Sequence, residues 1–114
     1  MLYLVKLEFI EENNAGKPIQ EVLAFIEGLV APSLEVLEKA VQNKKISGGL
    51  VAGAREGYFV MDASSHEEIA GFLRGLPFWQ AMKVTVVPLQ SPRSEIEQDK
   101  AIIQKARAML AGQR

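Results

Sequence analysis

Residues 57–89 read GYFVMDASSHEEIAGFLRGLPFWQAMKVTVVPL and contain a complete strand–helix–strand unit. The apolar run at 58–61 is typical of a strand, and residues 83–89 have the same character. Between the two runs, Ser64 and Ser65 are each followed three residues later by Glu, the capping-box pattern that begins a helix. This helix carries four apolar residues at helical spacing, and Pro77 is expected to end it.

The first half of the chain predicts the same order of elements. Residues 3–9 have the two-residue period of a strand with one well-buried face, in which the apolar set Tyr3, Val5, Leu7 and Phe9 alternates with Leu4, Lys6 and Glu8. Residues 13–16 have the composition of a loop. An apolar stripe of helical period then runs from Pro18 to about residue 45 and continues through Pro32. Because the ring of Pro32 clashes with the carbonyl of the residue four positions earlier, Gly28, we expect a kink there.

Residues 46–54 are apolar and glycine-rich, and Arg55-Glu56-Gly57 resembles a turn, so a hairpin leads into the strand at 58–61. The order β-α-β-β-α-β predicts an α+β, ferredoxin-like domain over residues 1–90 with an antiparallel sheet. Residues 91–114 form a C-terminal helical extension that opens at Pro92. Both helices of the domain are expected on one face of the sheet, which leaves the other face bare and favours a homodimer or a larger homo-oligomer.

The composition excludes several classes of protein. With 13 basic and 14 acidic residues, the net charge of −1 gives no field that would attract nucleic acid or anionic lipid. The chain has no cysteine and one histidine, which argues against disulfides, a catalytic triad and a transition-metal site. We expect a cytoplasmic protein without a membrane span, since the longest apolar stretch falls far short of the roughly 20 residues that a span needs.

RNA binding is an alternative because RNA-recognition motifs share this order of elements and carry aromatic residues on their strands. Tyr58 and Phe59 are adjacent in the sequence, however, so their side chains point to opposite faces of a strand and cannot both stack on bases. Together with the net charge, this spacing argues against RNA.

The run from Gly57 to Ser65, the later Leu76-Pro77-Phe78 and the strand from Met82 to Val86 resemble the muconolactone isomerase family, as does the opening MLYLVKL. The resemblance covers most of residues 1–90. It implies a dimeric α/β barrel and a proton shift on an unsaturated lactone without metal or cofactor. One departure is clear: the family has a His and a Trp-Arg pair in the strand before the hairpin turn, whereas residues 47–53 here carry nothing ionisable.

Six residues are candidates for a site. Lys6 and Glu8 lie two residues apart on one face of the first strand, where a base and a cation would serve a proton shift. The alternative is a structural ion pair near a subunit interface. Phe78 and Trp79 would wall an apolar substrate pocket or belong to the core, and Tyr58 and Asp62 share a strand face and would add polar groups. His66, in the first turn of a helix, is expected at the surface.

Two functions follow from these observations. The first is an isomerase-like enzyme that moves a proton on a small acidic or lactone molecule. The second is a non-catalytic binding or oligomerisation domain whose pocket is filled by Leu50, Val51 and aromatic residues. A cavity of a few hundred Å³ reached by Lys6 would favour the enzyme. The apolar stripe of the last helix, which includes Ile96, Ile103 and Leu110, is expected to pack on the first helix or across a subunit boundary. The turn away from the sheet at Ser91-Pro92 favours the boundary.

Overall fold

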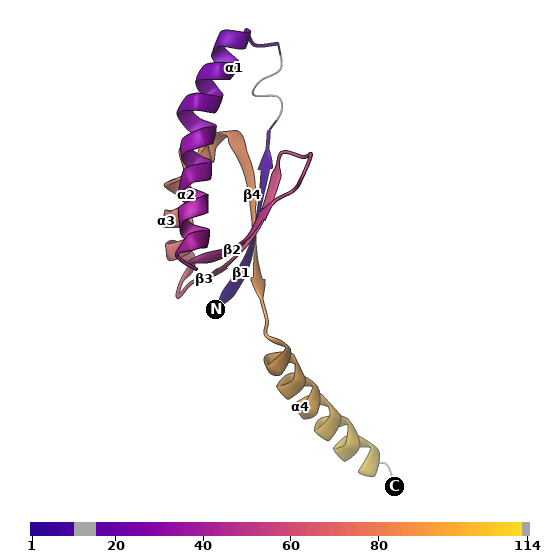
Figure 1. Cartoon of the computed structure of the whole chain (residues 1–114). Helices are drawn as coiled ribbons and strands as arrows, with labels where there is room; N and C mark the ends of the chain where they lie inside the picture. Colours follow the sequence, from indigo (N-terminus) through magenta and orange to yellow (C-terminus); the bar gives the residue numbers. More distant parts are fainter. Residues whose placement is uncertain (11–15, 113–114) are drawn as a thin grey trace.

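The computed structural model describes residues 1–10 and 16–112. It has two layers, with one face of a sheet covered by helices and a last helix that extends away from both layers (Figure 1). The predicted loop at residues 13–16 lies outside the described part except for Gly16, which is in a turn with φ +71°. The elements along the chain are β1 (Leu2–Phe9), α1 (Ile19–Phe25), η2 (Ile26–Val30), α2 (Ala31–Gln42), β2 (Ile46–Leu50), β3 (Glu56–Asp62), α3 (His66–Arg74), η3 (Trp79–Ala81), β4 (Met82–Leu89) and α4 (Pro92–Ala111).

The four strands form an antiparallel sheet in the order β2-β3-β1-β4. The central strand β1 pairs with both β3 and β4, so that Leu4 lies opposite Val60 on one side and Val87 on the other. This strand order, with α1, α2 and α3 on one side of the sheet (Figure 1), confirms the predicted ferredoxin-like α+β fold.

The core lies between the helices and the sheet face that bears the odd-numbered residues of β1. Tyr3, Val5 and Leu7 are buried, whereas the even-numbered residues of the same strand are half-buried or exposed. This difference follows from the two-residue period of a strand, which sends successive side chains to opposite faces. We call the second face, which none of the described helices covers, the open face; from β1 it presents Leu2, Leu4, Lys6 and Glu8.

The first helical region departs from α-helical geometry just before Pro32, at the place where the sequence predicts a kink. Residues Ile26–Val30 form a π-helical segment, in which the N–H of Ala31 donates to the carbonyl of Ile26. Pro32 has no N–H with which to complete the bond to Gly28, and the wider π turn accommodates this gap without ending the helix. The helical region therefore continues through Pro32, with a π-helical segment in place of a break.

Ser33 ties this helical region to the segment that follows α3. It is the one buried polar residue among those described, and its hydroxyl donates to the carbonyl of Leu29 at 2.6 Å. The same oxygen accepts a hydrogen bond from the backbone N–H of Phe78 at 2.9 Å. The serine thus satisfies a backbone donor that has no access to water.

We expect Ser33→Ala to lower the free energy of unfolding by about 1–3 kcal/mol, because the buried N–H of Phe78 would lose its acceptor. Urea denaturation followed by circular dichroism measures this change. Ser47→Ala, at an exposed position of β2, is the matched control and should change stability by no more than about 0.5 kcal/mol. Equal effects of the two substitutions would show that the Ser33 bridge contributes nothing.

The hairpin differs from its prediction in the position of the turn. Strand β2 ends at Leu50, not at residue 54, and Glu56 and Gly57 belong to β3 instead of the turn. The N–H of Val51 donates to the carbonyl of Glu56 at 2.9 Å and closes the loop, inside which Gly53 has φ +78°. Gly53 supplies the left-handed conformation that reverses the chain, so the turn forms around it and not around Gly57.

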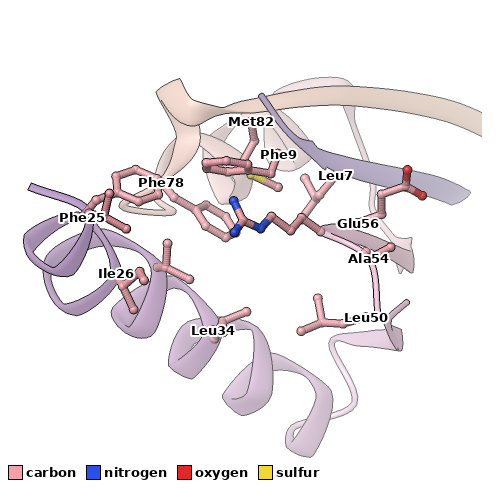
Figure 2. A pocket seen from close by; sticks show the side chains of 14 residues that line it. Leu7, Phe9, Phe25, Ile26, Leu34, Leu50, Ala54, Glu56, Phe78 and Met82 are labelled. Atoms are coloured by element: carbon pink, nitrogen blue, oxygen red, sulfur yellow. The ribbon is translucent and has the colours of Figure 1, made fainter. Parts of the chain in front are cut away.

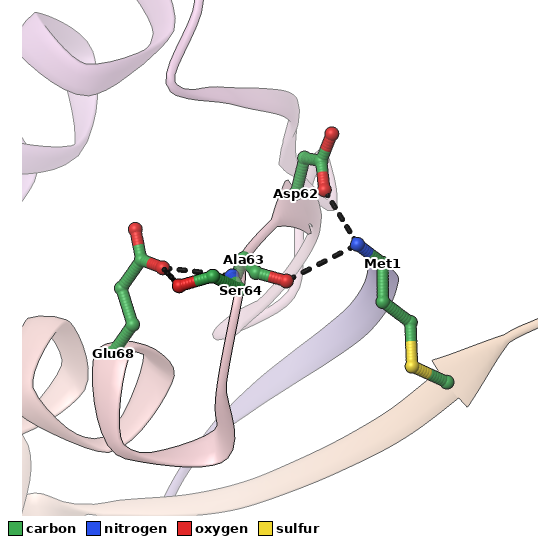
Figure 3. Close-up of polar contacts among 5 residues, drawn as sticks. All are labelled: Met1, Asp62, Ala63, Ser64 and Glu68. Atoms are coloured by element: carbon green, nitrogen blue, oxygen red, sulfur yellow. Dashed lines mark hydrogen bonds and ion pairs between the residues drawn. The ribbon is translucent and has the colours of Figure 1, made fainter.

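Helix α3 begins with the predicted cap. The Ser65 hydroxyl accepts from the N–H of Glu68, and the Glu68 carboxylate accepts from the N–H and hydroxyl of Ser64 at 2.8 and 2.9 Å (Figure 3). These hydrogen bonds from Ser64 lower the pKa of Glu68 below its ordinary value. The helix ends at Arg74, earlier than the expected stop at Pro77, because Gly75 takes the C-cap position.

Helix α4 begins at Pro92 as predicted, with the Ser91 hydroxyl accepting from the N–H of Ser94 at 3.1 Å. None of the residues Pro92–Ala111 is buried. The expectation that the apolar stripe of this helix packs on the first helix of its own chain is therefore wrong. No helix in the described ranges is both long and apolar enough to cross a membrane.

Candidate functional site

A cavity of about 330 Å³ lies between the covered face of the sheet and the α1–η2 region. It is lined by residues from β1, α1, η2, α2, the β2–β3 hairpin and the segment from Phe78 to Met82 (Figure 2). The lining residues are Leu7, Phe9, Val22, Phe25, Ile26, Val30, Leu34, Leu50, Ala54, Arg55, Glu56, Gly57, Phe78 and Met82. The volume is in the range of natural small-molecule sites, which begins at roughly 300 Å³.

The walls of the cavity are almost entirely apolar. Leu7 and Phe9 alternate along β1 onto the covered face, and α1 lies opposite them with Val22 and Phe25. The rings of Phe9 and Phe25 approach each other with centroids 5.6 Å apart. An apolar or aromatic ligand body therefore finds contacts on both sides.

Arg55 brings a positive charge to this apolar cavity. The guanidinium carbon of Arg55 lies 5.1 Å from the centroid of the Phe9 ring. The Arg55 carbonyl accepts a hydrogen bond from the N–H of Phe9 at 3.0 Å, which fixes the hairpin loop against the end of β1. The sequence showed a cation in the predicted turn, but only the fold places it beside the end of a different strand.

The other ionisable residue among the described lining residues, Glu56, turns its carboxylate away from the cavity. Figure 2 shows this carboxylate pointing away from the neighbouring lining side chains. It accepts a long hydrogen bond of 3.5 Å from the hydroxyl of Tyr58, its neighbour on the open face. Within the described residues, the cavity thus has a cation at its edge and no carboxylate directed into it.

Phe78 and Trp79 are neighbours in the sequence, but only Phe78 lines the cavity. Phe78 is buried, lines the cavity and also packs in the core, so both interpretations of this residue apply. Trp79 is half-buried against the core and is not part of the cavity lining. The cavity is not filled by Leu50, Val51 and aromatic residues; Leu50 lines its edge and is 57% exposed.

Lys6, Glu8 and Tyr58 come together on the open face, on the side of the sheet opposite the cavity. The ammonium of Lys6 lies 2.7 Å from the Glu8 carboxylate and 5.6 Å from the centroid of the Tyr58 ring. The hydrogen bond to Glu8, with a smaller contribution from Tyr58, raises the pKa of Lys6 above its ordinary value. The same bond lowers the pKa of Glu8. Lys6 does not line the cavity.

Asp62 lies at the far end of β3. Its carboxylate accepts from the amino group of Met1 at 2.9 Å, in an exposed ion pair (Figure 3). Asp62 shares the open face with Tyr58, as predicted, but not the cluster around Lys6. His66 is exposed, as expected. No group of three or more His, Asp or Glu side chains in the described part of the chain could hold a metal ion.

Neither the models of known protein families nor the curated protein sequences give a match to this chain. Solved structures do. A muconolactone isomerase crystal structure matches with a TM-score of 0.58 and 22% sequence identity, over 81% of this chain and 92% of that one. A 5-chloro-2-hydroxyhydroquinone dehydrochlorinase from Burkholderia phenoliruptrix, solved with 2,5-dihydroxybenzoquinone, matches with a TM-score of 0.56 and 21% identity, over 82% of this chain and 97% of that one. The resemblance to muconolactone isomerase is thus confirmed for the fold.

Proposed function

We propose that this chain binds a small unsaturated organic acid, or a lactone that carries an acidic group, in the cavity beside Arg55. The observation that carries the proposal is an apolar cavity of about 330 Å³ with one cation at its edge. Apolar walls bind a hydrocarbon or ring body through burial of apolar surface. The guanidinium of Arg55 suits a carboxylate because it offers a planar set of donors.

The similar structures support the same class of ligand. The first is named as an isomerase of muconolactone, and the second holds 2,5-dihydroxybenzoquinone, a small unsaturated ring with several oxygens. Arg55 would take the role of the cation that is absent from residues 47–53, although it comes from the following loop.

We expect Arg55→Gln to weaken binding of muconolactone by about tenfold or more, because a hydrogen bond to a charged group contributes about 1.5–3 kcal/mol. In the same variant, binding of the methyl ester of muconolactone, which has no negative charge, should change little. Isothermal titration calorimetry measures both affinities. Arg93→Gln, on the exposed helix α4, is the matched control and should leave both unchanged.

A second variant tests the cavity independently of the charge. Val22→Trp places a large ring among the lining residues and should abolish binding of both the acid and the ester. If Val22→Trp binds both ligands normally, or if Arg55→Gln weakens the acid and the ester equally, the assignment of the ligand to this cavity is wrong.

A proton shift is the second candidate function, and the Lys6–Glu8 pair is the observation that favours it. The pair combines a carboxylate and an ammonium 2.7 Å apart, with Tyr58 beside them. Because Lys6 lowers the pKa of Glu8, the carboxylate stays ionised but is a weaker base. Since Glu8 lies on the open face and does not line the cavity, the lactone would have to react on the open face. Glu8→Gln should then abolish incorporation of deuterium from D₂O into the lactone, whereas Arg55→Gln should leave this incorporation unchanged. Unchanged deuterium incorporation would remove Glu8 from the reaction.

We further propose that two copies associate through the open face. On this face an apolar patch lies outside the cover of the helices in the described ranges; it consists of Leu2, Leu4, Val60 and Val87. Leu2 and Val87 are 44% and 42% exposed. An apolar sheet face of this kind in a small domain favours a protein partner, and a twofold pair of sheets would bury both copies of the patch.

A further inference from the structure

Helix α4 presents to solvent an apolar surface that is interrupted by Asp99. Ile96, Ile103 and Leu110 recur every seven residues, and Ile102 and Met109 lie beside them on the same side of the helix. We call these five residues the α4 stripe. Their exposed fractions run from 43% for Ile96 to 65% for Leu110. A surface of this size on a helix indicates a contact with another molecule.

The charged residues of α4 indicate which charge the surface of that molecule should carry. Arg93, Lys100 and Arg107 also recur every seven residues and follow one edge of the α4 stripe. The helix has no acidic residue beyond Asp99, so residues 100–112 carry three cations, Lys100, Lys105 and Arg107, and a net charge of +3. The partner surface should therefore be apolar with acidic residues at its border.

Helix α4 is a poor partner for itself. In an antiparallel pair the same edges of the two helices meet, and the Arg93–Lys100–Arg107 edges would repel each other. In a parallel pair Asp99, which lies between Ile96 and Ile103 on the stripe, would face its own copy.

The α1–η2 segment offers the complementary surface. Residues 19–30 contain two acidic residues, Glu21 and Glu27, and no basic residue, which gives a net charge of −2. Ile19, Leu23 and Ile26 share one side of this helical region and are 69%, 49% and 45% exposed. Glu27 follows them directly and is also exposed.

The chain cannot easily bring its own α4 to this surface. The molecule extends over 77 Å, and α1 and α4 lie at opposite ends of it (Figure 1). To reach α1, the helix would have to reverse at residues 90–91, where the Ser91 hydroxyl caps its first turn. A second copy of the chain can present α1 to α4 without this reversal.

We infer that α4 of one chain docks, through its apolar stripe and the cations of residues 100–112, on the α1–η2 surface of a second copy. This contact is separate from the association through the open face. It does not depend on the ligand proposed for the cavity, although Ile26 belongs both to this surface and to the cavity lining.

Engineered cysteines test the contact, because the chain has none of its own. Leu23→Cys protein and mass-tagged Leu110→Cys protein are mixed at micromolar concentration, oxidised mildly and examined by mass spectrometry. The expected product is a disulfide-linked pair with one chain of each kind. Ala108→Cys, two residues from Leu110 and exposed on the opposite side of α4, is the matched control and should form little of this product.

Other products overturn the inference. Linked pairs of two Leu110→Cys chains alone would mean that α4 pairs with itself. A monomeric internal disulfide in the double variant Leu23→Cys/Leu110→Cys would mean that the helix folds back on its own chain. If no linked pair forms and the unmodified chain binds phosphatidylserine vesicles, the stripe contacts a membrane surface and not a second copy. If no linked pair forms and the chain does not bind the vesicles either, the inferred contact between two copies is also wrong.

A charge exchange tests the electrostatic part of the inference. Arg107→Glu should lower the yield of the mixed disulfide by roughly two- to fivefold, the effect expected of an exposed ion pair. Glu27→Lys in the other chain should restore part of the yield. If Arg107→Glu leaves the yield unchanged, the cations do not guide the docking.

Discussion

Replacing Gly48 by alanine is expected to lower the free energy of unfolding by about 3–5 kcal/mol. Gly48 has φ +124°, a conformation that residues with a side chain rarely adopt. A Cβ atom at this position would lie 2.1 Å from the carbonyl oxygen of Tyr58 and 2.9 Å from the Cα of Phe59. Because both of these atoms belong to the backbone of β3, the β2–β3 pairing would have to shift.

The neighbouring glycine provides the control. A Cβ atom at Gly49 would meet no other atom within 4 Å, and the φ of Gly49 is not positive, so Gly49→Ala should change stability by no more than about 1 kcal/mol. Urea denaturation of both variants measures the difference. Similar stabilities for Gly48→Ala and Gly49→Ala would mean that the two strands do not approach as closely at Gly48 as the structure shows.

A lysine at position 4 should separate the proposed dimer. Leu4 lies on the central strand of the open face, between Val60 of β3 and Val87 of β4. In a pair of sheets joined through this face, Leu4→Lys would bury a charge without a partner at a cost of about 3–5 kcal/mol, or roughly a thousandfold in Kd. Sedimentation velocity at micromolar concentration should show a dimer for the unmodified chain and a monomer for the variant.

Gln80→Lys is the control for this experiment, because it adds the same charge at an exposed position outside the sheet. This variant should sediment like the unmodified protein. The proposed dimer is wrong if the unmodified chain is a monomer under these conditions, or if Leu4→Lys remains a dimer with unchanged affinity.

Local patterns in the sequence were sufficient to predict most of the fold. The alternation along residues 3–9 predicted which side chains of β1 are buried, and the Ser65–Glu68 spacing predicted the start of α3. Pro32 predicted the departure from α-helical geometry. These features depend on the chain's own period, hydrogen bonding and sterics over a few residues, so they can be recognised without tertiary contacts. The hairpin turn was misplaced because both Gly53 and Gly57 could have reversed the chain.

The candidate site was less accessible from the sequence. Lys6 and Glu8 were placed correctly on one face of β1, and Tyr58 and Asp62 on one face of β3, because the alternation of a strand determines the face of each residue. Only the pairing of β1 with β3 shows that Tyr58 lies beside Lys6 and Glu8. The sequence left two interpretations of Phe78, a core residue or a wall of the pocket, and in the structure it is both. Arg55 was overlooked as a site residue, since no spacing in the sequence relates a turn residue to the far end of the first strand.

The sequence by itself determined the order of the elements, the covered and open faces of β1 and the apolar stripe of α4. Only the tertiary structure decided that a cavity remains between α1 and the sheet, that Arg55 and Phe9 meet at its edge, and that α4 stands apart from its own domain. The physical reason is that helical and strand periods arise from neighbours along the chain. A cavity depends on how two separately formed layers pack, and an unpacked helix depends on the direction in which the chain leaves the last strand.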